Sequence, residues 1–484
     1  MIEPNDAATA NTHDEGATIR RRTMLAGAAW AVPAVALTAA SPAFAASGTR
    51  VTITQAPAET PSCQGTKSSL VAHVDASQNV GQVVQFSLPS GWRWATGSGS
   101  YLTDSSGNAT VPAGDIVVGK TVGTVTATIS GVTAAVDLDV AGVGALATDS
   151  SSVPFPSGAN SEILRVRANM SGVVVVRTNG DIWSWYDNST TTDESWVQVG
   201  TGASTAPQAA TYVWSQNTKA ALWVKSGALQ LGSSAVTFPS GGNSGFARVA
   251  SCNSIAMAVK TNGEVWGWQE GGSWSQLDTG VADDLDQIAP VWDARSGNMF
   301  YWLKNGVIYS SAGGAITMGS GQNSGVARLS VAWMRDGYDT NLVAVKANGD
   351  AWVYARSQGW RSSATGAATG GEQSCPADTG SGGGTALVIR SGQLAKYGSA
   401  GNVGMASGES NSDFYRVATT WQYNVAVKRD GTMFGTYPVS GNNRSFTKIA
   451  SGTATGATQR GVSVAAAPGG GNRRRGFWIT TASC

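Results

Sequence analysis

Short alternations of apolar and polar residues, separated by glycine-rich turns, run along most of the chain. In the first part the alternation is clearest in VTITQAP, SSLVAHVDA, VVQFSLP, VGTVTATISG and AAVDLDV. A period of two is typical of strands that bury one face. Long runs of helix-forming residues are absent, so the pattern predicts an all-β protein.

The alternating segments between residues 49 and 142 are spaced as in a β-sandwich, with a turn signal after each. The stretch TDSSGNATVP, followed by GKTVGTVTATISG, resembles a bacterial Ig-like domain of the kind found in surface adhesins. Such modules usually act as spacers. The resemblance therefore implies an Ig-like β-sandwich over residues 49–142 that holds another domain away from a surface.

From Gly144 onward the chain repeats, and hairpin turns mark the repeat. Four hairpins, VVVVRTNGDIWSW, MAVKTNGEVWGW, VAVKANGDAWVY and VAVKRDGTMFGT, place their turn glycines at Gly180, Gly263, Gly349 and Gly431. Asn-Gly and Asp-Gly turns predict hairpins in which both turn residues have positive φ. Shorter hairpins with glycines at Gly227, Gly306 and Gly392 alternate with them. The full repeat therefore contains two hairpins.

One stretch near the start of the repeats shows how they close. Gly144–Ser161, GALATDSSSVPFPSGANS, matches Gly227–Ser244, GALQLGSSAVTFPSGGNS, without a gap and 83 positions apart. The C-terminal GVSVAAAPGGGNRRRGFWITTASC aligns with the first half of a shorter repeat and stops where its hairpin should turn. We therefore expect Gly144–Ser161 to complete the last repeat, which leaves no open sheet edge.

The pattern Arg-Val-Ala, followed by Ala-Val-Lys-x-Asn-Gly-x-Val-Trp-x-Trp, resembles the regulator of chromosome condensation repeat family. This resemblance implies a β-propeller of four-stranded blades over residues 144–484. The hairpins number eight when the shared one is included, which predicts eight blades. Seven blades, usual in the family, are the alternative, and the family's usual histidine before the hairpin is missing here.

The N-terminal segment, residues 1–46, reads as an export signal. Arg21 and Arg22 precede an alanine-rich apolar run in RRRTMLAGAAWAVPAVALTAASPAFAAS, which resembles a twin-arginine signal peptide. Ala43-Phe44-Ala45 supplies a small-x-small cleavage pattern. We expect a secreted or cell-surface bacterial protein with no membrane span in its mature form. A membrane anchor is the alternative, although the run is short and interrupted by Pro33.

Composition excludes several functions. Only 13% of the residues are charged and the net charge is +1, which gives no general attraction to nucleic acid. The two histidines are His13 and His73, both before the repeats. A Ser-His-Asp site and a histidine-ligated metal are therefore excluded from residues 144–484. We expect no metal, no cofactor and no catalytic residue there.

Four arginines are the candidate binding residues. Each follows an asparagine by five positions, in the pairs Asn160–Arg165, Asn243–Arg248, Asn323–Arg328 and Asn411–Arg416. These arginines begin the predicted innermost strands, where they could ring the propeller channel and hold an anionic group. The alternative is a structural role, in which they form salt bridges between blades.

The four cysteines allow three complete pairings. Cys252 and Cys375 fall in predicted blades that are not neighbours, so we expect no bond between them. Cys63, in the loop PSCQG, and Cys484, the last residue, both fall near the expected junction of the two domains. A disulfide between them is therefore possible in an exported protein.

These inferences predict an exported, monomeric, non-catalytic binding or adhesion protein that recognises an extracellular protein or carbohydrate. Two alternatives stay open. The first is an extracytoplasmic hydrolase or lyase that uses the propeller channel, which a pair of close carboxylates would favour. The second is a small-GTPase regulator, implied by the family resemblance but opposed by export.

Overall fold

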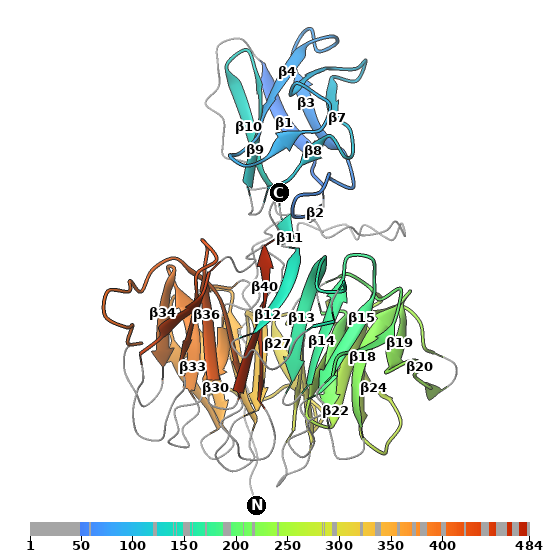
Figure 1. Cartoon of the computed structure of the whole chain (residues 1–484), viewed down its shortest axis with the longest axis vertical. Coiled ribbons are helices and arrows are strands. Elements are labelled where there is room, and N and C mark those ends of the chain that lie inside the picture. Colours follow the sequence, from blue (N-terminus) through green and yellow to red (C-terminus); the bar gives the residue numbers. More distant parts are fainter. Residues whose placement is uncertain are drawn as a thin grey trace, which may run out of the picture. The chain divides into compact units, whose positions relative to one another are not determined.

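The computed structural model describes residues 49–57, 60–119, 123–138, 140–141, 143–148, 155–156, 158–169, 172–186, 195–206, 208–214, 218–239, 242–282, 284, 286–292, 298–319, 323–333, 340–355, 359–369, 374–377, 385–397, 403–420, 423–436, 445–451, 462–466 and 474–481. Within these ranges the chain is all-β, with strands labelled in Figure 1 and no α-helix. No helix of the described residues is long and apolar enough to cross a membrane.

Two antiparallel sheets form the first part of the chain. One has the strand order β1-β3-β7 and the other β10-β9-β4-β6, with two small pairs, β2-β11 and β5-β8, beside them. The strands are β1 Arg50–Gln55, β2 Thr60–Pro61, β3 Leu70–Asp75, β4 Val83–Ser87, β5 Arg93–Trp94, β6 Ser100–Leu102, β7 Asn108–Val111, β8 Ile116–Val117, β9 Gly123–Ile129, β10 Val132–Leu138 and β11 Val140–Ala141.

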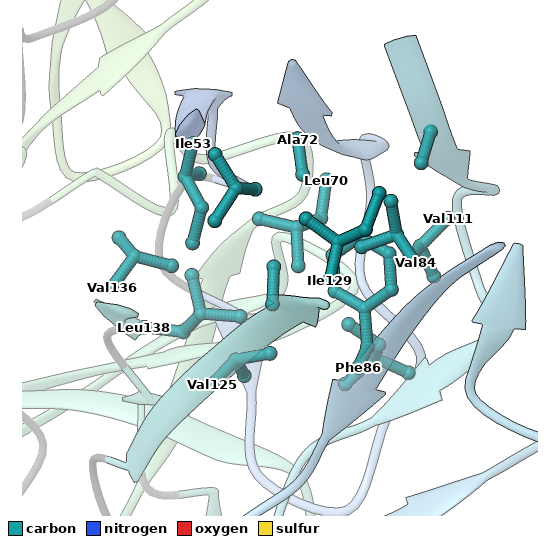
Figure 2. Close-up of a cluster of buried hydrophobic side chains, with 14 of the residues drawn as sticks. Ile53, Leu70, Ala72, Val84, Phe86, Val111, Val125, Ile129, Val136 and Leu138 are labelled. Atoms are coloured by element: carbon teal, nitrogen blue, oxygen red, sulfur yellow. The ribbon is translucent and has the colours of Figure 1, made fainter. Parts of the chain in front are cut away.

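Alternate residues of these two sheets share one core. In β3 and β9 every second residue is buried, as the sequence pattern predicts. Side chains from both sheets meet in a single apolar cluster, including Ile53, Leu70, Phe86 and Val125 (Figure 2). This is the architecture of a two-sheet sandwich. Its classification as Ig-like stays a prediction.

The described strands from Gly144 to Thr481 form eight antiparallel groups of three or four. In order outward from the first strand, group one is β13 Ile163–Asn169, β14 Gly172–Arg177, β15 Ile182–Tyr186 and β16 Val197–Gly200; group two is β17 Ala210–Trp214, β18 Lys219–Lys225, β19 Ala228–Leu231 and β20 Ser234–Ala235; group three is β21 Phe246–Cys252, β22 Ile255–Lys260, β23 Val265–Gln269 and β24 Ser275–Asp278; group four is β25 Ile288–Val291, β26 Met299–Lys304 and β27 Val307–Ser310.

The remaining groups follow the same order. Group five is β28 Val326–Trp333, β29 Thr340–Lys346, β30 Ala351–Ala355 and β31 Gly359–Ala364; group six is β32 Ser374–Ala377, β33 Thr385–Arg390 and β34 Gln393–Tyr397; group seven is β35 Phe414–Thr420, β36 Tyr423–Lys428, β37 Met433–Thr436 and β38 Thr447–Ala450; group eight is β39 Val462–Ala466, β40 Arg474–Thr481 and β12 Gly144–Thr148.

Group eight is built from both ends of this part of the chain. β40 lies between β39 and β12, with Leu146 opposite Ile479 and Gly144 opposite Thr481. The prediction that Gly144–Ser161 completes the last repeat is therefore confirmed for its strand. The burial of Ile479 and Phe477 in this sheet makes the junction part of the core.

The first strands of the groups contact one another around a ring. Each touches the next, in the order β13, β17, β21, β25, β28, β32, β35 and β39, and β39 touches β13 again. These contacts describe a β-propeller and favour eight blades over seven. The blade count stays a prediction.

The groups are joined in pairs, which explains why the repeat contains two hairpins. The N–H of Phe246, at the start of group three, donates to the carbonyl of Gly227 in group two, and Val326 and Phe414 repeat this bond with Gly306 and Gly392. Ile163 pairs with Gly144 in the same way, so groups eight and one run together as one seven-stranded sheet.

The repeated asparagines reinforce these joints. Asn243 Oδ1 accepts from the N–H of Leu229 at 2.6 Å, and its Nδ2 donates to the carbonyls of Leu229 and Val236 at 3.0 and 2.8 Å. Asn160, Asn323 and Asn411 make the same two-way bond with Leu146, Ile308 and Leu394. The spacing that marked the repeat is therefore a set of side-chain links between paired groups.

The hairpin turns correct one expectation. Positive φ at both turn residues holds for the shorter hairpins, as at Asn305 (53°) and Gly306 (74°). It is wrong for the Asn-Gly and Asp-Gly hairpins, where only the glycine has positive φ, as at Gly180 (82°). Asn179 instead accepts a hydrogen bond from the N–H of Asp181 through its side chain at 2.9 Å. This Asx turn holds the asparagine in an ordinary conformation.

Candidate functional site

The four predicted arginines occupy one repeated position. Each is the third residue of a first strand, in β13, β21, β28 and β35, directly after an irregularity in the strand register. They are Arg165, Arg248, Arg328 and Arg416. The prediction that they begin the innermost strands agrees with this placement.

Two of these arginines bind backbone in the loop that leads to the next group. Arg165 Nε donates to the carbonyl of Thr205 at 3.2 Å, and Arg328 Nε donates to the carbonyl of Thr369 at 3.0 Å. Arg328 also forms an ion pair with Asp284 at 3.1 Å. Arg416 is buried with its guanidinium 4.4 Å from the ring centre of Tyr415. These contacts support a structural role, and an anion-binding role stays a prediction.

Little space is open beside Arg165. The cavity that it lines with Arg167 and Gln208 measures about 10 Å³, which is close to the minimum for one water molecule. Gln208 also forms hydrogen bonds with Asp286, a residue of another loop. Its Nε2 donates to Asp286 Oδ1 at 2.7 Å, and its Oε1 accepts from the N–H of Asp286 at 3.1 Å. This buried pair links the loops before groups two and four.

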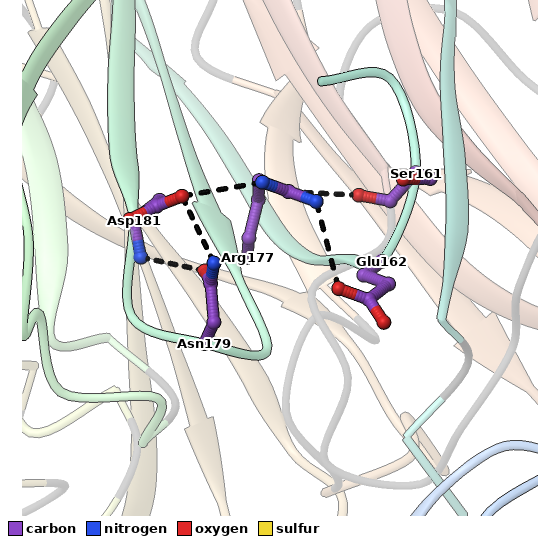
Figure 3. A network of polar contacts seen from close by, with 5 residues as sticks. All are labelled: Ser161, Glu162, Arg177, Asn179 and Asp181. Atoms are coloured by element: carbon purple, nitrogen blue, oxygen red, sulfur yellow. Dashed lines mark hydrogen bonds and ion pairs between the residues drawn. The ribbon is translucent and has the colours of Figure 1, made fainter. Parts of the chain in front are cut away.

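The basic residues of the hairpins form local networks. Arg177 contacts Asp181 at 3.2 Å and Glu162 at 3.5 Å, and it donates to the carbonyl of Ser161, as Figure 3 shows. Lys260 pairs with Glu264 at 2.8 Å in the equivalent hairpin. A hydrogen bond from Lys260, supported by Asn262 and Trp266, lowers the pKa of Glu264 to about 2. Glu264 is therefore ionised at neutral pH and bonded within its own hairpin, so it is not poised to act as a general acid.

No metal site is present in the described part of the chain, where no three histidine, cysteine, aspartate or glutamate side chains gather. In the acidic segment ADDLD, Asp284 pairs with Arg328 and Asp286 with Gln208, while Asp283 lies outside the described residues.

The cysteines separate into two kinds. Cys252 in β21 and Cys375 in β32 are buried and form no disulfide, so the expectation that they do not bond to each other is confirmed. Cys63 is disulfide-bonded. Cys484 lies outside the described residues, so its pairing with Cys63 stays a prediction.

An aromatic pocket opens between groups two and three. Its volume is about 570 Å³, and it is lined by Val213, Leu222, Leu231, Ser234, Ala235, Val236, Thr237, Phe238, Pro239, Trp268, Gly272, Ser273 and Trp274. We call this set the aromatic pocket. Its size and apolar lining with a few hydroxyl groups are typical of small-molecule sites.

Three stacked rings form one wall of the aromatic pocket. The rings of Trp268 and Trp274 are 6.2 Å apart at 23°, and those of Trp274 and Phe238 are 5.2 Å apart at 26°. Trp268 Nε1 donates to the carbonyl of Gly272 at 3.0 Å, which fixes its ring. Trp266 and Trp268 lie in the predicted hairpin MAVKTNGEVWGW, but the sequence pattern does not reveal the pocket.

The comparisons with known proteins concern the fold alone. No family model matches the chain, and no curated protein matches it. Among solved structures, the computationally designed Ika8 protein is 14% identical, with 67% of this chain and 98% of that chain covered and a TM-score of 0.40. Human WBSCR16 is 12% identical, covering 68% and 90%, with a TM-score of 0.37. Prp20p from Saccharomyces cerevisiae is 8% identical, covering 71% and 92%, with a TM-score of 0.35.

Proposed function

We propose that this chain is an exported, non-catalytic binding or adhesion protein that recognises an extracellular protein or carbohydrate. The observation that carries the proposal is the aromatic pocket, whose lining contains no acid, base or thiol. Such a lining offers contact area and hydroxyl groups to a ligand but no group that transfers a proton or attacks a bond. Binding without chemistry is therefore the function that this pocket supports best.

Two features of the sequence supply the rest of the proposal. The twin-arginine pattern at Arg21 and Arg22 supports export, and the Ig-like segment before the propeller supports a spacer role. The carboxylates that a hydrolase or lyase would need are held in turns, as at Asp181 and Glu264. No observation favours regulation of a small GTPase.

Export and binding are tested separately. Replacing Arg21 and Arg22 together by lysine is expected to keep the protein inside the cell, since the twin-arginine pathway reads this pair. Lysine at the unrelated positions Arg93 and Arg50 is the control. Export of the doubly substituted signal at the normal level would contradict the localisation.

Binding is tested by screening the full-length protein against a glycan array and against a panel of purified extracellular proteins. We expect saturable binding in one of these screens and no turnover of the bound molecule. Absence of binding in both, or release of cleaved products, would contradict the proposed function.

A further inference from the structure

The repeat supplies an internal comparison for the aromatic pocket. Leu229 in β19 is opposite Val224, Leu146 in β12 is opposite Ile479, and Ile308 in β27 is opposite Leu303. These pairs are equivalent, so the residues two positions earlier on the second strand are equivalent too. They are Leu222 in group two, Phe477 in group eight, Tyr301 in group four and Leu387 in group six, where the neighbouring group has Thr436 rather than an aromatic residue at the corresponding position.

At two of these joints an aromatic ring packs near the aromatic ring of the next group. The ring centres of Phe477 and Trp185 are 5.6 Å apart, and Trp185 is 1% exposed. The ring centres of Tyr301 and Tyr354 are 6.2 Å apart. Trp268 is the residue of group three that corresponds to Trp185 and Tyr354, because each lies two positions after the first aromatic residue of its strand. Its counterpart across the joint is Leu222.

The smaller residue leaves the joint between groups two and three open. Leucine lacks the ring that Phe477 and Tyr301 supply, and Trp268 stays partly exposed beside a volume of about 570 Å³. A surface hollow of this volume with a mainly apolar lining lies within the range of small-molecule sites. An exposed tryptophan face at a concave site is typical of a ligand contact.

The lining restricts what this site can hold. It has no charged side chain, so a charged ligand would lose hydration without gaining a counter-charge. The lining residues Ser234, Thr237 and Ser273, which we call the rim, are exposed and offer hydroxyl groups to a ligand. The matching ligand is neutral, with an apolar face for the tryptophan and hydroxyl groups for the rim.

We propose that the aromatic pocket binds a neutral sugar, with a pyranose ring stacked on Trp268 and its hydroxyl groups bonded to the rim. The inference rests on the proposed binding function and names its ligand class. The stack of Phe238 and Trp274 behind Trp268 holds that ring in place, so little side-chain freedom is lost on binding.

The test uses the full-length protein on an array of neutral, sialylated and sulfated glycans. Leu222→Phe restores the ring found at Phe477 and is expected to reduce neutral-glycan binding at least tenfold. Trp268→Ala should reduce binding equally, and Ser273→Ala with Thr237→Ala less strongly. Tyr354→Ala is the matched control, because it removes the equivalent ring at a joint where the neighbouring residue is the aromatic Tyr301. Thermal unfolding of every variant checks that it is folded.

The outcomes separate the pocket from the function. Neutral-glycan binding that survives both Leu222→Phe and Trp268→Ala would leave the binding function intact and overturn this site. Binding of sialylated or sulfated glycans alone, or of no glycan, would overturn the ligand class. A protein partner whose binding is lost in Leu222→Phe would also overturn it, since the pocket would then take a protein side chain.

Discussion

Arg165 connects the first strand of group one to the loop that leads to group two. Its Nε donates to the carbonyl of Thr205, and the side chain is buried. Replacing Arg165 by alanine should lower the free energy of unfolding by about 1–3 kcal/mol, because the partly buried carbonyl of Thr205 loses its partner and the buried side chain loses its packing. Thermal and urea unfolding measure this loss, with the exposed Lys448→Ala as the control. Unchanged stability together with lost ligand binding would instead support the anion-binding role of the arginines.

The stability of the folded protein should depend on pH through Glu264. Hydrogen bonds from Lys260, Asn262 and Trp266 hold its pKa at about 2, below its ordinary value of 4.5. The folded state therefore favours the ionised form, and this contribution is present above about pH 4.5 and is lost as the pH falls towards 2.

Glu264→Gln should accordingly be less stable than the natural protein at neutral pH, and the two should converge between pH 4.5 and 2. Unfolding followed across this range measures the difference. Glu409→Gln is the control, since Glu409 forms no ion pair with a described residue. A stability gap that stays constant to pH 2 would show that the carboxylate charge is not the cause.

At the scale of single elements, local sequence predicted most of the strands. The Asn-Gly and Ser-Gly hairpins lie where the sequence places them, because a turn glycine fixes where two strands separate. The prediction of positive φ at the asparagine of the Asn-Gly turns was wrong. The asparagine side chain forms an Asx turn with the backbone, which the spacing of glycines does not reveal. The aromatic pocket was missed for a related reason. Its lining comes from strands and loops of two different groups, which lie together only once those groups are packed.

The strand β40 provides the prediction at this scale. It is the central strand of group eight, and Phe477 and Ile479 on it are buried. Deleting residues 474–484 should separate β12 from β39 and lower the melting temperature far more than loss of a frayed terminus would. Removal of residues 1–46, which the sequence predicts to be cleaved on export, is the control. Equal melting temperatures for the shortened and the natural protein would contradict the shared group.

For the whole molecule, closure of the ring depends on residues that are far apart in the sequence. The match between Gly144–Ser161 and Gly227–Ser244, 83 positions apart, predicted this closure. The half-repeat that is missing at the C-terminal end must be supplied by the segment at the start of the repeats. The contact of β39 with β13 completes the circle of first strands. The order of groups around the ring therefore follows from the sequence, whereas links between loops of groups that are not adjacent, such as Gln208 before group two with Asp286 before group four, follow only from the packed structure.

The disulfide prediction concerns the same closure. Cys63 is disulfide-bonded, and Cys252 and Cys375 form no disulfide, so Cys484 is the remaining cysteine of the chain. A Cys63–Cys484 bond would close a loop of more than 400 residues, and the chain-entropy estimate for loops above 100 residues is about 5 kcal/mol. Peptide mapping without reduction should recover the two cysteines in one linked fragment, and reduction should lower the melting temperature. Cys63→Ser should lower it equally, while Cys252→Ser should leave the reduction effect in place. Alkylation of both Cys63 and Cys484 in the unreduced protein, or a linkage between two copies of Cys63, would show that the bond within the chain does not form.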